Sequence, residues 1–96
     1  MVARAFVLSA AHPDQPEAVQ IYGDGVRPLL AEAGATIAYR GAVAHTLAGK
    51  EMPGTVLIIE FDHAEAARDF FAQPAYQALI PTREKAFATM QIHIAE

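Results

Sequence analysis

Polar side chains that can hold an anion or move a proton fall at strand ends and loop starts of the predicted sheet: Ser9, His12, Arg40, Glu60 and His63. A hairpin through the loop 48–54 would place Arg40 opposite residue 61 or 62, which makes Arg40 and Glu60 neighbours. Ser9 ends the strand expected beside the one that carries Glu60, and the two histidines begin the loops that follow. The spacing therefore predicts one polar rim of the sheet.

This rim has two interpretations. Arg40 can hold an anionic oxygen of a ligand while Glu60 or a histidine moves a proton. The two residues can instead form a structural ion pair, because a charge inside or beside an interface is tolerated only when it is paired. In this second case the histidines are solvated residues at helix starts. We expect no metal and no cofactor, because the sequence has no cysteine and no HxH or HExxH spacing.

Three further residues are candidates for the walls of a ligand pocket. Tyr22 lies on an apolar helical stripe, where an aromatic residue usually packs in the core and its hydroxyl finds one partner. Tyr76 and Arg83 lie in the segment before the last strand. They either close over a pocket beside the sheet, or Arg83 only anchors the connection to the last strand.

The strand predicted at the centre is Thr55–Phe61, a β-branched and aromatic run that is apolar on both faces. The first strand is predicted over Ala3–Ala10, and the last over Thr89–Ile94, where apolar and polar residues alternate. Ala35–Leu47 is predicted as a long second strand with a bulge or bend at Gly41.

Two helices are expected between these strands. The first is expected to begin at Asp14 and Glu17 and the second at Asp62 and Glu65, since both pairs have capping-box spacing. Their buried stripes step by three and four residues. A short helical turn at 76–79 and a charged segment at 83–85 precede the last strand.

The order β-α-β-β-α-β predicts an α+β fold of the ferredoxin-like type, a four-stranded antiparallel sheet with both helices on one face. We expect the first and third strands to be central and parallel. The face under the helices is predicted to carry Phe6, Leu8, Leu57, Ile59 and Phe61. The opposite face carries Val7, Ser9, Val56, Ile58, Glu60, Gln91 and His93. Its apolar centre predicts a homodimer through this face.

The composition limits the classes of partner that we expect for this protein. The 96 residues predict a single domain over 1–96, and the 53% apolar content is high for so short a chain, which also favours a subunit interface. A net charge of −4 without a basic patch excludes nucleic acid and anionic membranes as expected partners. Because no signal peptide or membrane-length apolar run is visible, we expect a cytoplasmic protein.

Motifs spread over almost the whole chain resemble small bacterial proteins grouped as domain of unknown function 1330. The matching residues are Tyr22, Pro28-Leu29-Leu30, Gly34, Arg40-Gly41, Leu47-Ala48-Gly49, Glu60-Phe61, Ala66-Ala67, Tyr76-Gln77-Ala78-Leu79 and Arg83. The sequence departs from the pattern at Ala33-Gly34-Ala35, where a glycine pair is usual. The resemblance implies a protomer of the dimeric α/β-barrel superfamily, whose members include cofactor-free monooxygenases, muconolactone-type isomerases and proteins without known catalysis.

Two functions remain open from the sequence. One is a non-catalytic dimeric protein that binds a small apolar or aromatic carbonyl compound or acid. The alternative is a cofactor-free monooxygenase- or isomerase-like enzyme. An open cavity lined by Tyr22, Arg40 and Glu60 would favour the enzyme, whereas mutual pairing of Arg40 and Glu60 in a filled interior would favour the binding or accessory protein.

Overall fold

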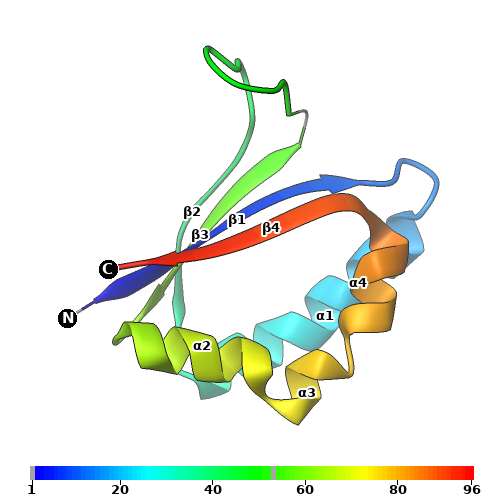
Figure 1. Cartoon of the computed structure of the whole chain (residues 1–96). Helices are drawn as coiled ribbons and strands as arrows, with labels where there is room; N and C mark the ends of the chain where they lie inside the picture. Colours follow the sequence, from blue (N-terminus) through cyan, green and yellow to red (C-terminus); the bar gives the residue numbers. More distant parts are fainter. Residues whose placement is uncertain (1, 53) are drawn as a thin grey trace.

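A computed structural model describes residues 2–52 and 54–96 of the chain (Figure 1). The elements in order are β1 (Ala3–Ala11), α1 (Pro16–Glu32), β2 (Thr36–Ala42), β3 (Thr55–Phe61), α2 (Ala64–Ala72), α3 (Pro74–Gln77), α4 (Ile80–Ala86) and β4 (Phe87–Ala95). The predicted element order is confirmed, and the charged segment before the last strand forms α4. Pro53, which the sequence predicts at the end of the hairpin loop, lies outside the described residues.

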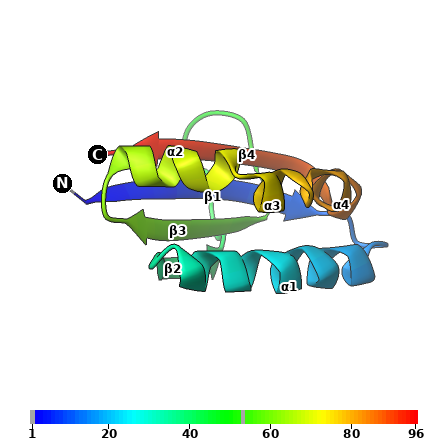
Figure 2. The same cartoon turned by 90° about the horizontal axis from the view of Figure 1, so that it is seen from below.

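The strands form one sheet in the order β2-β3-β1-β4, and every neighbouring pair is antiparallel. All helices lie on one side of it, with α2 to α4 in a row across β1 and β4 and α1 alongside β2 (Figure 2). The ferredoxin-like fold is therefore confirmed. The predicted parallel pairing of β1 with β3 is wrong. A helical crossover makes β1 and β2 run the same way, so β3, which returns through the hairpin and inserts between them, must oppose both.

The core lies between the sheet and the helices. Its buried residues are Ala5, Val7, Leu30, Ile59, Phe61, Ala67, Phe70 and Tyr76. On β3 the predicted faces are correct, since Ile59 and Phe61 are buried under the helices. On β4 they are also correct, because Met90, Ile92 and Ile94 pack against this core.

On β1 the predicted faces are reversed. Ala3, Ala5 and Val7 point toward the helices, whereas Phe6 and Leu8 pair with Ile58 and Val56 on the helix-free face. The small side chains of Ala3 and Ala5 are fully buried, and β1 is one of the strands against which α2 packs.

The hairpin between β2 and β3 differs from its predicted form. The second strand ends at Ala42 instead of Leu47, and its irregularity falls between Ile37 and Tyr39 instead of at Gly41. The loop beyond β2 stands away from the body of the molecule (Figure 1), and Leu47 in it is 97% exposed. The shorter strand moves the centre of the hairpin, and this changes which residues of β2 and β3 face each other.

Both predicted capping boxes are absent. The N-cap of α1 is Gln15, whose side chain makes no capping hydrogen bond, and Pro16 occupies the first turn. The N-cap of α2 is His63, whose Nδ1 accepts a hydrogen bond of 3.1 Å from the backbone N–H of Ala66. A ring nitrogen thus takes the role expected of the Asp62 carboxylate. No helix in residues 2–52 and 54–96 combines the length and apolarity needed to cross a membrane.

Candidate functional site

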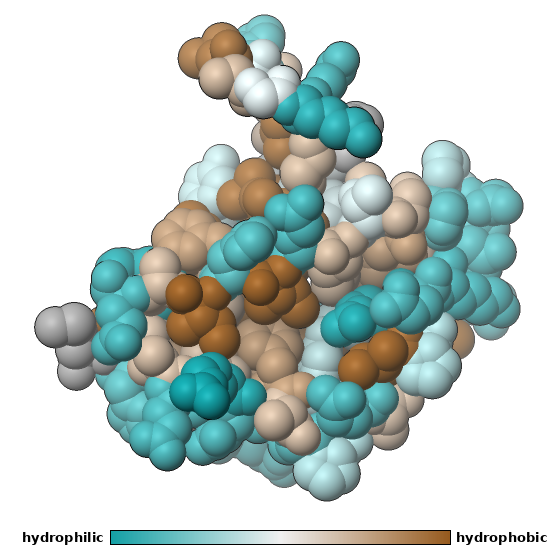
Figure 3. Space-filling model, viewed as in Figure 1, coloured by the Kyte–Doolittle hydropathy of each residue, from teal (hydrophilic) through white to brown (hydrophobic). Residues whose placement is uncertain are grey.

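A cavity of about 460 Å³ lies between α1 and the helix-covered face of the sheet. Its walls are mainly apolar and aromatic and include Val26, Leu57, Phe70, Phe71, Phe87 and Met90. Seen from the side of β4, apolar side chains gather in the layer between the strands and the helices (Figure 3). Protein sites for small molecules are typically concave, largely apolar and roughly 300–1,000 Å³ in volume, so this cavity has the size of a ligand site.

The cavity exists because α1 packs against its helical neighbours more closely than against the sheet. Its most extensive packing is with α4, and it makes further contacts with α3. Gly25 allows this arrangement, since a Cβ at this position would lie 2.6 Å from Cδ2 of Leu79, which joins α3 to α4. The helix is therefore held from the side, and the space between it and the strands stays open.

Arg40, Ser9 and Thr55 supply polar groups to the cavity wall. Ser9 and Thr55 are direct partners on β1 and β3, and Arg40 on β2 lies opposite Leu57. All three therefore belong to the end of the sheet where the hairpin begins. Among the described residues no carboxylate lies within ion-pair distance of the Arg40 guanidinium. Arg27 also lines the cavity, but it is paired with Asp24.

The predicted neighbourhood of Arg40 and Glu60 is wrong. Glu60 lies opposite Thr36, four positions along β2 from Arg40, and its side chain is on the helix-free face. Its carboxylate pairs there with Arg4, whose Nε and Nη2 both lie 3.1 Å from Oε2. The earlier end of β2 and the bulge after Ile37 account for the change of register.

The predicted polar rim is also divided. Since β1 and β3 are antiparallel, Ser9 and Glu60 lie at opposite ends of the sheet. His12 lies in the turn after β1, where its backbone N–H donates to the backbone carbonyl of Ala86, and His63 is the N-cap of α2. Neither histidine lines the cavity. Within residues 2–52 and 54–96, no three acidic or histidine side chains are grouped so that they could hold a metal ion.

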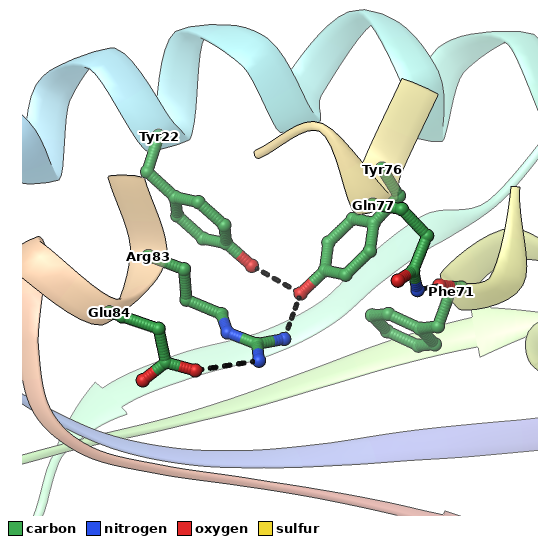
Figure 4. Close-up of polar contacts among 6 residues, drawn as sticks. All are labelled: Tyr22, Phe71, Tyr76, Gln77, Arg83 and Glu84. Atoms are coloured by element: carbon green, nitrogen blue, oxygen red, sulfur yellow. Dashed lines mark hydrogen bonds and ion pairs between the residues drawn. The ribbon is translucent and has the colours of Figure 1, made fainter. Parts of the chain in front are cut away.

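Tyr22, Tyr76 and Arg83 meet in the layer between the helices and the sheet (Figure 4). The two tyrosine hydroxyl oxygens are 2.8 Å apart, and Nη1 of Arg83 donates to the Tyr76 hydroxyl at 3.1 Å. The Arg83 guanidinium also lies 5.9 Å from the centre of the Tyr76 ring and donates to Glu84. Arg83 thus anchors α4 to α3, and among these three side chains only Tyr22 lines the cavity.

The surroundings of Tyr22 keep its hydroxyl protonated. Burial is the main reason that the pKa of Tyr22 lies far above its usual value. The ring itself packs edge-on against Phe87, with ring centres 5.5 Å apart, and against Tyr76. Tyr22 is therefore fixed in orientation and remains a hydrogen-bond donor at neutral pH.

Sequence reasoning identified Tyr22, Arg40 and Arg83 as candidates, but missed two features. The sequence marks Thr55 only as the start of the central strand, although its pairing with Ser9 puts it on the cavity wall. The sequence also does not indicate the contact of Tyr22 with Tyr76, because it joins residues 54 positions apart. No periodicity in the sequence signals that contact, since it depends on how α1 and α3 pack.

Comparison with solved structures identifies relatives of the same fold. A protein of unknown function from Rhodopseudomonas palustris superposes with a TM-score of 0.79 at 20% identity, covering 98% of this chain and 80% of the other. A dimeric ferredoxin-like protein of unknown function from Jannaschia sp. CCS1 gives 0.75 at 12% identity, covering 100% and 99%. An ethyl tert-butyl ether d (ethd) family protein from Bacillus halodurans gives 0.65 at 15% identity, covering 100% and 98%.

Identities this low establish the fold alone. No curated protein matches the sequence. A family model does match it, over residues 4–96, which is nearly its whole length. This confirms the resemblance that the sequence motifs indicate, and the chain belongs to the family described as domain of unknown function (DUF1330).

Proposed function

We propose that the protein binds a small apolar or aromatic molecule with an anionic group, such as a carboxylate, in the cavity between α1 and the sheet. The observation that carries the proposal is Arg40, a cation on the wall of an apolar cavity without a carboxylate partner among the described residues. A guanidinium can bind a carboxylate through two parallel hydrogen bonds. Ser9 and Thr55 add hydroxyl groups at the same end of the sheet.

Binding is a better match to this site than proton transfer. The described residues that line the cavity include no aspartate, glutamate or histidine. Arginines stay protonated in proteins, and the raised pKa of Tyr22 keeps its hydroxyl neutral, so these groups do not exchange protons near neutral pH. An isomerase-like enzyme needs a group that accepts a proton, and Glu60 lies on the other face of the sheet. We therefore favour a binding protein over the alternative enzyme.

Calorimetric titration with phenylbutanoate tests this proposal. We expect wild type to bind it, and Arg40→Met to bind it at least about tenfold more weakly, because hydrogen bonds to charged groups contribute roughly 1.5–3 kcal/mol. Arg68→Met is the matched control, since Arg68 is exposed on α2 and does not line the cavity. The uncharged phenylbutanamide should bind weakly to all three proteins.

Two outcomes would refute the proposal. One is that wild type binds no phenylalkanoate. The other is that Arg40→Met and Arg68→Met change the affinity for phenylbutanoate equally, since a cation far from the cavity should then matter as much as the one on its wall.

We also infer that two copies of the chain associate through their helix-free sheet faces. The centre of this face is apolar and consists of Phe6, Leu8, Tyr39, Val56 and Ile58. Tyr39 is 55% exposed, and its ring lies across Gly41. A monomer would leave this patch in water, and several proteins of the same fold are described as dimeric.

Sedimentation at micromolar concentration tests the dimer. We expect a dimer for wild type and a monomer for Ile58→Asp, because the substitution would bury a carboxylate in the middle of an apolar contact. Ala75→Asp on the exposed side of α3 is the control and should remain dimeric. A monomeric wild type would refute the inference.

A further inference from the structure

The hydrogen bonds among Arg83, Tyr76 and Tyr22 have a defined direction. A guanidinium has donors and no acceptor, so the Tyr76 oxygen must accept from Arg83 Nη1. The contact of 2.8 Å between the two hydroxyl groups can run either way in principle. Which tyrosine donates depends on where the remaining hydroxyl hydrogen of each can go.

Tyr76 has nowhere else to donate. It is 1% exposed, it does not line the cavity, and among the described residues its hydroxyl meets only Arg83 and Tyr22. If Tyr22 donated to Tyr76, the hydrogen of Tyr76 would be buried without an acceptor, which proteins avoid. Tyr76 therefore donates to Tyr22. The hydrogen of Tyr22 is then left over, on a residue that lines the cavity.

We propose that this relay, from Arg83 through Tyr76 to Tyr22, presents a hydrogen-bond donor to the ligand, and that the ligand is a carboxylic acid with an acceptor oxygen remote from its carboxylate. Aryl keto acids are the chemical class that combines these features with an apolar body. The proposal rests on the proposed function and adds the second polar group of the ligand.

The two polar groups lie toward opposite edges of the sheet. Arg40 is on β2, whereas Tyr22 packs against Phe87 of β4. Three strand spacings of about 4.8 Å separate the backbones of these edge strands. Arg40 extends from one of them, and the ring of Tyr22, which is carried by α1, reaches Phe87 on the other. A ligand that meets both groups therefore needs several bonds between its carboxylate and its acceptor oxygen.

The charge at the far end of the relay strengthens its last donor. Hydrogen bonds to an ionised group are stronger than neutral ones, and chains of them polarise one another. The raised pKa of Tyr22, caused mainly by burial, keeps the donor protonated over the whole neutral range. The relay thus supplies a strengthened hydrogen-bond donor, which a carbonyl oxygen of the ligand can accept.

Calorimetry with matched pairs of acids tests the proposal. Benzoylpropanoate, benzoylbutanoate and benzoylpentanoate are each compared with the phenylalkanoate of the same chain length, which has a methylene in place of the carbonyl. For at least one chain length, wild type should bind the keto acid about three- to tenfold more tightly, the range expected for one hydrogen bond. Tyr22→Phe should abolish this preference, so that each keto acid and its matched phenylalkanoate bind with nearly equal affinity. Tyr39→Phe, on the helix-free face, should retain the preference.

An infrared measurement on wild type does not depend on whether Tyr22→Phe folds. The carbonyl stretch of the bound keto acid, labelled with carbon-13, should lie below its frequency in an aprotic solvent. A carbonyl stretch equal to that in the aprotic solvent, or a keto preference that survives Tyr22→Phe, would overturn the proposal. If Arg40→Met weakens both series in these cases, the proposed function stands without the relay. If neither series binds to wild type, both fail.

Discussion

Truncation of Ile59 tests whether the packing of β3 is understood. Ile59 is 2% exposed and lies in the core between the sheet and the helices. Replacement by alanine removes three carbon atoms, which at about 0.8 kcal/mol each gives roughly 2.4 kcal/mol. Because Ile59 also lines the cavity, its neighbours are unable to collapse into the space, so the total should reach about 3 kcal/mol, within the usual range of 2–5. For a chain of this length, the melting temperature should fall by roughly 12–24 °C.

Urea unfolding followed by circular dichroism measures this loss. The matched variant is Ile58→Ala, which removes the same atoms from the adjacent residue on the helix-free face. If that face is a dimer contact, the loss of unfolding free energy in Ile58→Ala should increase with protein concentration, because only the dimer contains the contact. The loss for Ile59→Ala should be independent of concentration. Equal and concentration-independent losses, or a loss below about 1 kcal/mol for Ile59→Ala, would show that the two faces are misassigned.

Three further outcomes are expected. The stability of wild type should fall as the pH rises through about 10, because Tyr22 is ionised in the unfolded chain but stays protonated in the folded one. Urea unfolding at several pH values measures this loss of stability, which should be smaller in Tyr22→Phe. Removing the cap in His63→Ala should cost about 1 kcal/mol, and His63→Asn should restore most of it in thermal melts. Gly54→Ala should cost more than roughly 2 kcal/mol, because a Cβ at this position would lie 2.0 Å from the carbonyl oxygen of Ser9. If the variant is as stable as wild type, the described packing of β3 on β1 is wrong.

The sequence predicts the architecture well because its signals are local. The run Thr55–Phe61 coincides with β3 in both bounds, and the alternation before the C-terminus correctly orients β4. Element order and right-handed crossovers then correctly place β1 and β3 in the middle of the sheet, although these two strands are antiparallel and not parallel as predicted. These features depend on periodicity and chain connectivity, and residues close together in the sequence determine both.

Side-chain pairing between strands is much harder to predict. Where β2 ends depends on the loop, and a shift of the hairpin centre by a few residues moves Arg40 from the neighbourhood of Glu60 to that of Leu57. The orientation of β1 fails for a related reason. Both of its faces are apolar, so only the close approach of the helices shows that its alanines, and not Phe6, lie inside.

The positions of the candidate residues relative to the cavity follow only partly from the sequence. Tyr22 and Arg40 do line one cavity, whereas Glu60 and His12 do not, and Arg83 acts on Tyr76 instead of on the cavity. The prediction grouped polar residues by the end of the sheet at which they lie. It therefore did not distinguish which face of the sheet each side chain is on. That distinction depends on register, which the sequence did not resolve.

The alternation of β3 has a practical consequence for protein engineering. Successive side chains of this strand belong to different surfaces: Thr55, Leu57 and Ile59 line the cavity, while Val56 and Ile58 face the helix-free side. Because each residue projects to one side only, the lining of the cavity can be changed at the odd-numbered positions while the outer surface keeps its composition. A library randomised at Thr55 and Leu57 would therefore vary the shape and polarity of the cavity on an otherwise constant scaffold.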